Sequence, residues 1–383
     1  MDKIQKKSIK MKIGILTMHR VVNYGSTLQA YALQQTLFKI GCDNELIDYV
    51  FPELPKRHIC RIIEGKIRRF IYLIRVGKLF TESKEVKFRK FRKKYLKLSA
   101  RKYNRNSLLQ SCPLYDIYMT GSDQVWNPQW IKDDTSFFLS FAPPQAVKIS
   151  YASSFSVNHI DKVYSELFAQ MLCQYQHITV REESGTRIVK ELTGMRAECV
   201  CDPTLLLTKE EYEPLVQASN VTFKGPFILV YILSYMFNPF PEVNKIVANV
   251  SNELDLPVVY LDGNKYVVYE KTCKTVSEVG PCEFLWLFKN ADFIITTSFH
   301  GCAFASIFTK PLLAVINHGE HDDRVTSLLN KMDNKKSVVY YDSDASIDID
   351  NLLSYIPKSE KVEEFRSYSI QILKNIIKST YSL

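Results

Sequence analysis

The residues from Asp292 to Ile316 contain a histidine well placed for acid–base chemistry. They read D-F-I-I-T-T-S-F-H-G-C-A-F-A-S-I-F-T-K-P-L-L-A-V-I. Phe293 to Thr297 is typical of a buried parallel strand, and helical spacing resumes after Gly301. His300 is therefore predicted on the turn between a strand and a helix N-terminus, where free N–H groups and the helix dipole favour anions. The imidazole could exchange protons with an anionic ligand or cap its own helix, and the local pattern leaves both open.

Polar residues also follow several other predicted strands. The groups are Asn23-Tyr24-Gly25, Ser122-Asp123-Gln124, Ser153-Ser154, Arg181-Glu182 and Ser298 to Gly301. The carboxyl ends of parallel strands lie at one edge of a sheet, so side chains that follow them can converge on one cleft. The sequence therefore predicts one polar site assembled from several loops.

The elements that must position these groups form two successive α/β patterns. Strands are predicted at Met11–Met18, Leu46–Val50, Asp116–Thr120, Val147–Ala152 and Ile178–Val180, then at Phe227–Leu233, Pro257–Leu261, Phe293–Thr297 and Leu312–Ile316. Helices are predicted from Thr27 to Gly41, at Glu242–Leu254 and at Phe284–Lys289. The first turn lacks G-x-G-x-x-G, so a dinucleotide site is not supported.

The chain of 383 residues is long enough for two domains of ordinary size. We predict an α/β fold with an N-terminal domain at 11–220, a hinge at 221–226 and a C-terminal domain at 226–355 that carries the S-F-H-G turn. An amphipathic helix at 359–381 is expected to pack back on the first domain. The two domains should face each other across a cleft.

The net charge of +9 comes from one segment. Residues 56–105 hold 19 Lys and Arg against three acids, while the rest of the chain has 31 basic and 38 acidic residues. Phe88, Phe91, Tyr95 and Leu98 recur at helical spacing, so we predict a basic helical insertion in the first domain. It could be a solvated helical excursion or lie on an anionic membrane surface, where each Lys or Arg contributes about 1 kcal/mol. No nucleic-acid-binding module accompanies it, so no nucleic-acid partner is expected.

Composition favours a cytoplasmic protein. No apolar run approaches the roughly 18 residues of a membrane-spanning helix, and the N-terminal segment is a poor signal peptide. The nine cysteines are odd in number, and the Cys199-x-Cys201 pair lacks a second pair of ligands nearby. Reduced thiols and no metal site are expected.

Six motifs, in this order and spacing, resemble the polysaccharide pyruvyl transferase family. They are N-Y-G-S-x-L-Q-A-Y-A-L at 23–33, T-G-S-D-Q-V-W-N-P at 120–128, S-Y-A-S-S-F at 150–155, V-R-E-E-S-G at 180–185, D-P-T-L-L-L at 202–207 and S-F-H-G at 298–301. Each motif alone is weak, but six in register are quite specific. The resemblance extends from about residue 11 to about residue 329.

The resemblance implies a glycosyltransferase-B-like fold with two Rossmann-like domains, and transfer of the enolpyruvyl group of phosphoenolpyruvate to a sugar. Phosphoenolpyruvate would be a co-substrate, with no other cofactor. Arg181 matches the family's donor-binding arginine, and a guanidinium suits a phosphate or a carboxylate. His300 matches the catalytic histidine, expected to act as general acid and then as general base. The acceptor could be linked to a polyprenyl diphosphate, which would place the enzyme at the inner face of the plasma membrane.

One position departs from some relatives, which have an arginine two residues before this histidine. Here that position is Ser298, so one expected cation for the donor is missing. His318, His321 and Arg324 could supply replacement charge, or they could be solvated loop residues. The latter interpretation is slightly favoured.

The remaining motif residues have two interpretations each. Asp123 could act in catalysis by orienting an acceptor hydroxyl, or it could cap its own turn. Asn23 and Gly25, with Tyr24, could bring backbone N–H groups to a substrate, or form a helix N-cap and a tight turn. Trp126 and Trp130 could stack on a sugar ring, although buried anchoring is favoured. Ser153, Ser154, Ser298 and Gly301 complete the candidate substrate-binding set.

Three functions remain open from the sequence. The favoured one is pyruvyl transfer to a surface polysaccharide, exopolysaccharide or capsule, or to its lipid-linked precursor, with formation of a ketal. A nucleotide-sugar-dependent glycosyltransferase of similar fold is the second, and Ser298 makes it harder to dismiss. The third is a non-catalytic glycan-binding protein.

Overall fold

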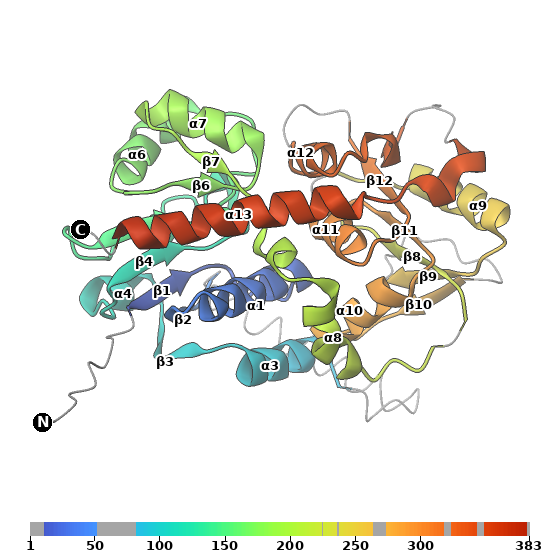
Figure 1. The fold of residues 1–383 in the computed structure, drawn as a ribbon, viewed down its shortest axis with the longest axis horizontal. Coiled ribbons are helices and arrows are strands. Elements are labelled where there is room, and N and C mark those ends of the chain that lie inside the picture. The colour runs from blue at the N-terminus through green and yellow to red at the C-terminus, as the bar shows by residue number, and fades with distance from the viewer. Residues whose placement is uncertain are drawn as a thin grey trace, which may run out of the picture.

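The computed structural model contains two parallel β-sheets, one in each half of the chain (Figure 1). The structure describes residues 11–51, 82–223, 225–235, 237–262, 273–317, 323–342 and 348–380. We call the part around the first sheet the first half and the part around the second sheet the second half. Every strand pair in both sheets is parallel, as the alternation of strands and helices predicted.

The first sheet has five strands in the order β3-β2-β1-β4-β5. Its strands are β1 (Lys12–Leu16), β2 (Asp43–Tyr49), β3 (Leu98–Tyr103), β4 (Ile117–Thr120) and β5 (Val147–Ser150). A parallel pair, β6 (Thr179–Val180) and β7 (Glu198–Cys199), continues beyond β5 through isolated bridges. β1 therefore lies at the centre of the first half.

The second sheet has six strands in the order β10-β9-β8-β11-β12-β13. They are β8 (Ile228–Tyr231), β9 (Val258–Leu261), β10 (Cys273–Val276), β11 (Phe293–Thr296), β12 (Leu312–Ile316) and β13 (Val338–Tyr340). All residues of β8, β9 and β11 are buried, which agrees with their unbroken apolar sequences. β11, the strand before His300, lies at the centre of this sheet.

Helices cover both sheets. In the first half they are α1 (Tyr24–Lys39), α3 (Lys84–Tyr95), α4 (Arg105–Gln110), α5 (Pro128–Ile131), η1 (Thr135–Phe138), α6 (Lys162–Leu172), α7 (Glu183–Thr193) and η2 (Pro203–Leu206). α8 (Lys209–Gln217) follows, and then come α9 (Glu242–Leu254), α10 (Pro281–Asn290), α11 (Phe299–Ile307), α12 (Arg324–Lys331), η3 (Lys335–Ser337), η4 (Ile349–Ser354) and α13 (Ser359–Thr380).

The helical prediction for the basic segment is partly wrong. Within its described residues, α3 ends at Tyr95, and Leu98–Tyr103 forms the edge strand β3 instead of continuing the helix. Leu98 pairs with Leu46 of β2, so sheet pairing overrides the helical spacing. Residues 56–81 lie outside the described residues.

The basic residues of α3 connect the two halves. The Lys84 ammonium pairs with Asp262, and the Lys87 ammonium lies 2.6 Å from Glu283. Tyr24, at the start of α1, stacks on Phe284 of α10 with ring centroids 4.4 Å apart. These contacts help to join the two halves in one apolar core cluster.

Two further helices connect the halves. α8 precedes the predicted hinge but packs against α10, with Glu213 and Lys289 joined by a 2.5 Å ion pair. α13 runs across both halves (Figure 1): its first turns lie near α11, and Ser369 accepts a 2.9 Å hydrogen bond from the N–H of Cys201.

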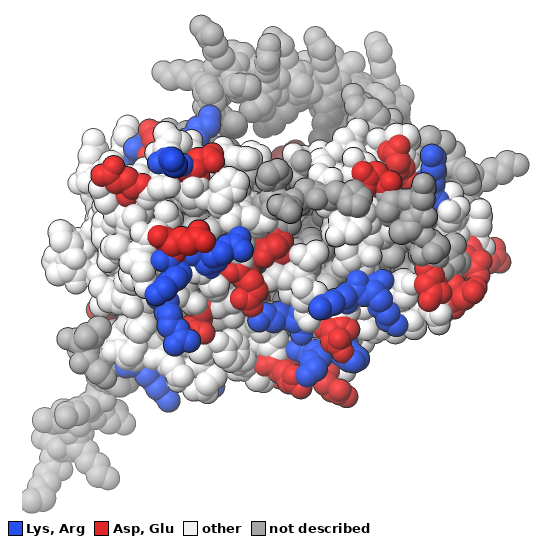
Figure 2. Space-filling view, turned by 90° about the horizontal axis from the view of Figure 1, so that it is seen from above, with Lys and Arg blue, Asp and Glu red and all other residues white. Residues whose placement is uncertain are grey.

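Charges are mixed on the face viewed in Figure 2, where Lys and Arg lie beside Asp and Glu over its described part. Lys331 pairs with Glu183 and Lys361 with Glu364, each at 2.5 to 2.7 Å. None of the helices in the described ranges is long and apolar enough to cross a membrane.

Candidate functional site

The N-termini of α1 and α11 meet at His300. Gly25 lies in the first turn of α1, and a Cβ atom at this position would overlap the imidazole ring of His300. Each helix follows the central strand of its own sheet, so the carboxyl ends of β1 and β11 approach each other here. Glycine is therefore required by the close approach of two helices from opposite halves.

α11 begins earlier than predicted. His300 is the second residue of the helix, and Ser298 is the N-cap, whose Oγ accepts a 3.2 Å hydrogen bond from the N–H of Gly301. A Cβ at Gly301 would overlap Thr296 of β11, so glycine lets the helix start directly against its strand. The prediction that α1 starts at Thr27 is also wrong, because Asn23 caps it and it begins at Tyr24.

Arg181 and His300 converge on a carboxylate that the sequence did not single out, that of Asp202. Its Oδ2 accepts a 3.1 Å hydrogen bond from Nη1 of Arg181 and lies 3.6 Å from Nε2 of His300. Ser122 Oγ donates to the same oxygen at 2.9 Å. The arginine and the histidine thus share one anion at the junction of the two halves.

Asp202 is held rigidly as an ionised group. It is the N-cap of η2, and its Oδ1 accepts the N–H of Thr204 at 2.9 Å. Burial by itself raises the pKa of this carboxyl, but the charges of His300 and Arg181 and the Thr204 N–H outweigh burial and lower that pKa well below its usual value. A negative charge beside His300 is therefore present throughout the neutral range.

Several buried polar atoms around Asp202 have no hydrogen-bond partner. They are Nε and Nη2 of Arg181, Oε2 of Glu182 and Nε2 of His300. Buried polar groups are normally satisfied, and orphaned ones gather where a ligand or water completes the site. The Phe299 ring covers the guanidinium of Arg181 at 4.3 Å, so in this conformation the arginine is closed to solvent.

Glu182 extends the buried charge network. Its Oε1 accepts hydrogen bonds from Ser154 Oγ and from the N–H of Phe155, both at 2.9 Å. Burial raises its pKa, while Arg181 and Arg324 act in the opposite direction. Arg324 itself is buried at the start of α12. The interpretation of Arg324 as a solvated loop residue is therefore wrong.

Asp123 connects the loops of the first half. Its φ of 82° is left-handed, its Oδ1 accepts the N–H of Gln124 at 2.9 Å, and its Oδ2 accepts the hydroxyl of Ser26. Ser153 forms a backbone bridge with Asp123, and its Oγ donates to Gly121. The structure thus brings the predicted polar groups together, with Asp123 capping its own turn.

The other candidates are Tyr24, two tryptophans and two histidines. The side chain of Tyr24 points away from it, since its hydroxyl donates to Asp262 at 2.8 Å. Trp126 is a fully buried anchor stacked on Phe138, whereas Trp130 is 46% exposed. His318 and His321 lie outside the described residues.

Sequence reasoning missed two site residues, Asp202 and Ser26. Asp202 begins the D-P-T-L-L-L motif, and its N-cap geometry with Pro203 was readable. Its contact with His300 was not, because 98 positions separate them and nothing local links them.

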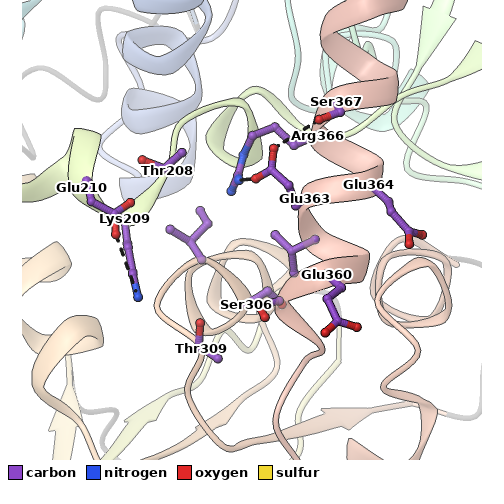
Figure 3. A pocket seen from close by; sticks show the side chains of 13 residues that line it. Thr208, Lys209, Glu210, Ser306, Thr309, Glu360, Glu363, Glu364, Arg366 and Ser367 are labelled. Carbon is purple, nitrogen blue, oxygen red and sulfur yellow. Dashed lines mark hydrogen bonds and ion pairs between the residues drawn. The ribbon is translucent and has the colours of Figure 1, made fainter.

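A separate pocket lies at the other end of α11, between α11, the start of α8 and α13 (Figure 3). It has a volume of about 650 Å³ and is lined by Thr208, Ser306 and Arg366, among others. The Arg366 guanidinium donates to the carbonyl oxygens of Leu205 and Leu207. Arg366, at the edge of this pocket, therefore helps to hold α13 in place.

Comparisons with known proteins give one family match and a set of similar folds. The family model described as polysaccharide pyruvyl transferase matches residues 23–319, a range that includes Asp123, Arg181, Asp202 and His300. The sequences of curated proteins give no match.

Solved structures show the same fold at low identity. A UDP-GlcNAc 2-epimerase from Neisseria meningitidis, bound to UDP-GlcNAc, has a TM-score of 0.55 at 10% identity and covers 97% of this chain and 99% of its own. The epimerase from Methanocaldococcus jannaschii has a TM-score of 0.54 at 11% identity and covers 96% and 100%. The fold is thus glycosyltransferase-B-like, with two Rossmann-like units, as predicted.

Proposed function

This chain belongs to the polysaccharide pyruvyl transferase family, and on that basis we propose that it transfers the enolpyruvyl group of phosphoenolpyruvate to two hydroxyls of a sugar, forming a pyruvate ketal. The acceptor would be a surface polysaccharide or its lipid-linked precursor. The observation that carries the proposal is the unpartnered Nε2 of His300, 3.6 Å from Asp202, at the N-terminus of a buried helix.

The proposed reaction needs one proton donor and one proton acceptor. Protonation of the methylene carbon of phosphoenolpyruvate makes its central carbon electrophilic, and the first sugar hydroxyl attacks that carbon. Phosphate then leaves, and the second hydroxyl closes the ketal. Of the two hydroxyl protons, one ends on the methyl group and one on the phosphate, so no oxidant or reductant is required.

His300 has the position for both proton transfers. Its Nε2 has no hydrogen-bond partner, so this nitrogen can donate a proton to the donor and later accept one from the attacking hydroxyl. Asp202 Oδ2, 3.6 Å from this same nitrogen, would balance the charge of the protonated imidazole. Proton transfer by a positioned side chain typically contributes ~10²–10⁴-fold to the rate.

Arg181 would bind one anionic group of the donor. Its Nη1 is bonded to Asp202 and its Nε lies 3.8 Å from Oε2 of Glu182, while Nη2 has no hydrogen-bond partner. Because Phe299 covers the guanidinium, we propose that this ring moves when the donor binds. The N-terminal N–H groups of α11 would receive phosphate, and Arg324 could add the charge that Ser298 does not supply.

Release of inorganic phosphate tests the reaction. The wild-type protein, with phosphoenolpyruvate and lipid-linked sugar acceptors, should release phosphate only when the acceptor is present. His300→Ala should lower the rate by ~10²–10⁴-fold while circular dichroism shows an unchanged fold. His159→Ala, which changes an exposed histidine paired with Asp161, is the matched control. Wild-type rates in a folded His300→Ala protein would sink the mechanism.

A thermal-shift comparison tests the donor. Phosphoenolpyruvate should raise the melting temperature of the wild-type protein, and Arg181→Lys should weaken that shift, because lysine cannot make the bidentate contact. A shift with UDP-sugars and none with phosphoenolpyruvate would favour a nucleotide-sugar glycosyltransferase instead.

A further inference from the structure

Two exposed aromatic side chains, one from each half, meet beside the candidate site. Trp130 in α5 is 46% exposed and Tyr235, after β8, is 49% exposed. Their ring centroids lie 6.4 Å apart, with the ring planes inclined by 68°. Large aromatic side chains are usually at least largely buried, so an exposed pair in mutual contact is a candidate binding surface.

The side-chain amide of Gln124 is hydrogen-bonded to both aromatic side chains. Its Oε1 accepts hydrogen bonds from Nε1 of Trp130 at 2.8 Å and from Nδ2 of Asn127 at 3.1 Å, and its Nε2 donates to the hydroxyl of Tyr235 at 3.3 Å. Because the tyrosine oxygen accepts this bond, its own proton remains available for a ligand. The rings are therefore held in place by their edges, and much of their surface stays open.

Sequence neighbours, hydrogen bonds and one close contact connect the aromatic pair to His300. Gln124 follows Asp123, whose carboxylate accepts both the Gln124 N–H and the Ser26 hydroxyl. Ser26 follows Gly25, which lies against the imidazole. A molecule resting on the aromatic pair would thus be beside the same carboxyl edge of the sheet as the reacting groups.

We propose that Trp130 and Tyr235 form the platform that binds the acceptor sugar. A pyranose has apolar C–H faces that pack on aromatic rings, and equatorial hydroxyls at its edge that suit the Tyr235 hydroxyl and the Gln124 amide. The platform rests on the proposed function in one respect, that the acceptor is a carbohydrate. It also explains why the two halves must come together, since each contributes one ring.

Binding of simple sugars tests the platform without any turnover. In saturation-transfer NMR, the wild-type protein should bind at least one pyranoside among methyl β-glucoside, methyl β-galactoside and methyl N-acetyl-β-mannosaminide. Trp130→Ala should abolish the signal and Trp130→Phe should retain part of it. Tyr368→Ala removes a tyrosine that is 44% exposed on α13 and is the matched control. Failure of the wild-type protein to bind any of the three, or unchanged binding by Trp130→Ala and Tyr235→Ala, would overturn the platform.

Kinetics separate this proposal from the proposed reaction. Trp130→Ala and Tyr235→Ala should each raise the acceptor KM about tenfold, the usual effect of removing an aromatic anchor, and leave the KM for phosphoenolpyruvate unchanged. Binding that depends on Trp130 without pyruvyl transfer by the wild-type protein would reject the reaction and keep the platform. Pyruvyl transfer with an unchanged acceptor KM in both variants would reject the platform and keep the reaction.

Discussion

His300 has room in the structure only because residue 25 is glycine. The imidazole lies against the backbone of α1, where any Cβ would overlap it. The position of the proposed acid–base group therefore depends on a residue in the other half of the molecule, which could not be inferred from the S-F-H-G motif alone.

Gly25→Ala tests this dependence. The new methyl group should displace the imidazole, and a displacement of about 1 Å can cost ~10²-fold in rate. Phosphate release measures the effect. The control is Gly41→Ala, just after α1, where φ is 91° and the new Cβ would have open space, so that this change should affect stability only. Wild-type activity in Gly25→Ala would contradict the close approach.

Asp202→Asn should destabilise the protein and change its pH dependence. Removing this buried charge breaks the hydrogen-bonded ion pair with Arg181 and leaves the arginine only Glu182, 3.8 Å away, and the loss of one partner of a buried pair costs about 3–5 kcal/mol. The pKa of Asp202 is lower in the folded protein than in the unfolded chain, where it is about 3.9. Its contribution to stability is therefore complete above that unfolded-state value. The contribution is lost as the pH falls toward the folded-state pKa. Urea denaturation at several pH values should show a gap between wild type and variant at pH 7 that narrows below about pH 4. A gap independent of pH would contradict the ionised state. Asp133→Asn, on the surface, is the control.

At the scale of elements, most of the described strands were predictable from the sequence, whereas several helices, such as α6 and α12, and the ends of elements were not. β8, β9 and β11 are unbroken apolar runs, so their burial was readable. The predicted starts of α1 and α11 are three residues too late, because a glycine near a helix start also favours a turn. β10 was not predicted, and Leu98 was assigned to a helix, because pairing with β9 and β2 decides both edge strands.

α13 stabilises the segment that carries Asp202. The Arg366 guanidinium, seen beside Glu363 in Figure 3, donates to the carbonyl of Leu205 at 2.6 Å, and Ser369 accepts the N–H of Cys201. Ser369→Ala leaves that buried N–H unsatisfied and should lower the free energy of unfolding by about 1–3 kcal/mol.

Thermal and urea denaturation check this prediction for α13. Lys361→Ala, which removes an exposed pair with Glu364, should change stability by less than about 0.5 kcal/mol and is the control. If Ser369→Ala is as stable as Lys361→Ala, the hydrogen bond from Cys201 to Ser369 does not stabilise the segment that carries Asp202.

At the scale of the whole molecule, the two-sheet fold was predicted and the contacts between the halves were not. Alternating strands and helices predict two parallel sheets. The stacking of Tyr24 on Phe284 and the pairing of Lys84 with Asp262 join residues far apart in sequence. The side chain of Tyr24 thus packs between the halves. The membrane contact of residues 56–105 stays a prediction.

Tyr24→Phe tests the junction between the halves. It removes the hydroxyl that donates to Asp262 at 2.8 Å and to the Val279 carbonyl at 3.2 Å, which should lower stability by about 1 kcal/mol. Calorimetry should show a lower or split transition. Tyr368→Phe, whose hydroxyl bonds Glu198 on the surface, should leave the transition unchanged. Equal effects of the two changes would contradict a specific role for Tyr24.

The mass of the acceptor after reaction tests the central claim most directly. With phosphoenolpyruvate and a lipid-linked sugar, the wild-type protein should produce an acceptor heavier by one pyruvic acid less one water, and His300→Ala should produce almost none. An acceptor that gains mass only with a UDP-sugar, or equal product from the wild-type protein and His300→Ala, would contradict pyruvyl transfer at His300.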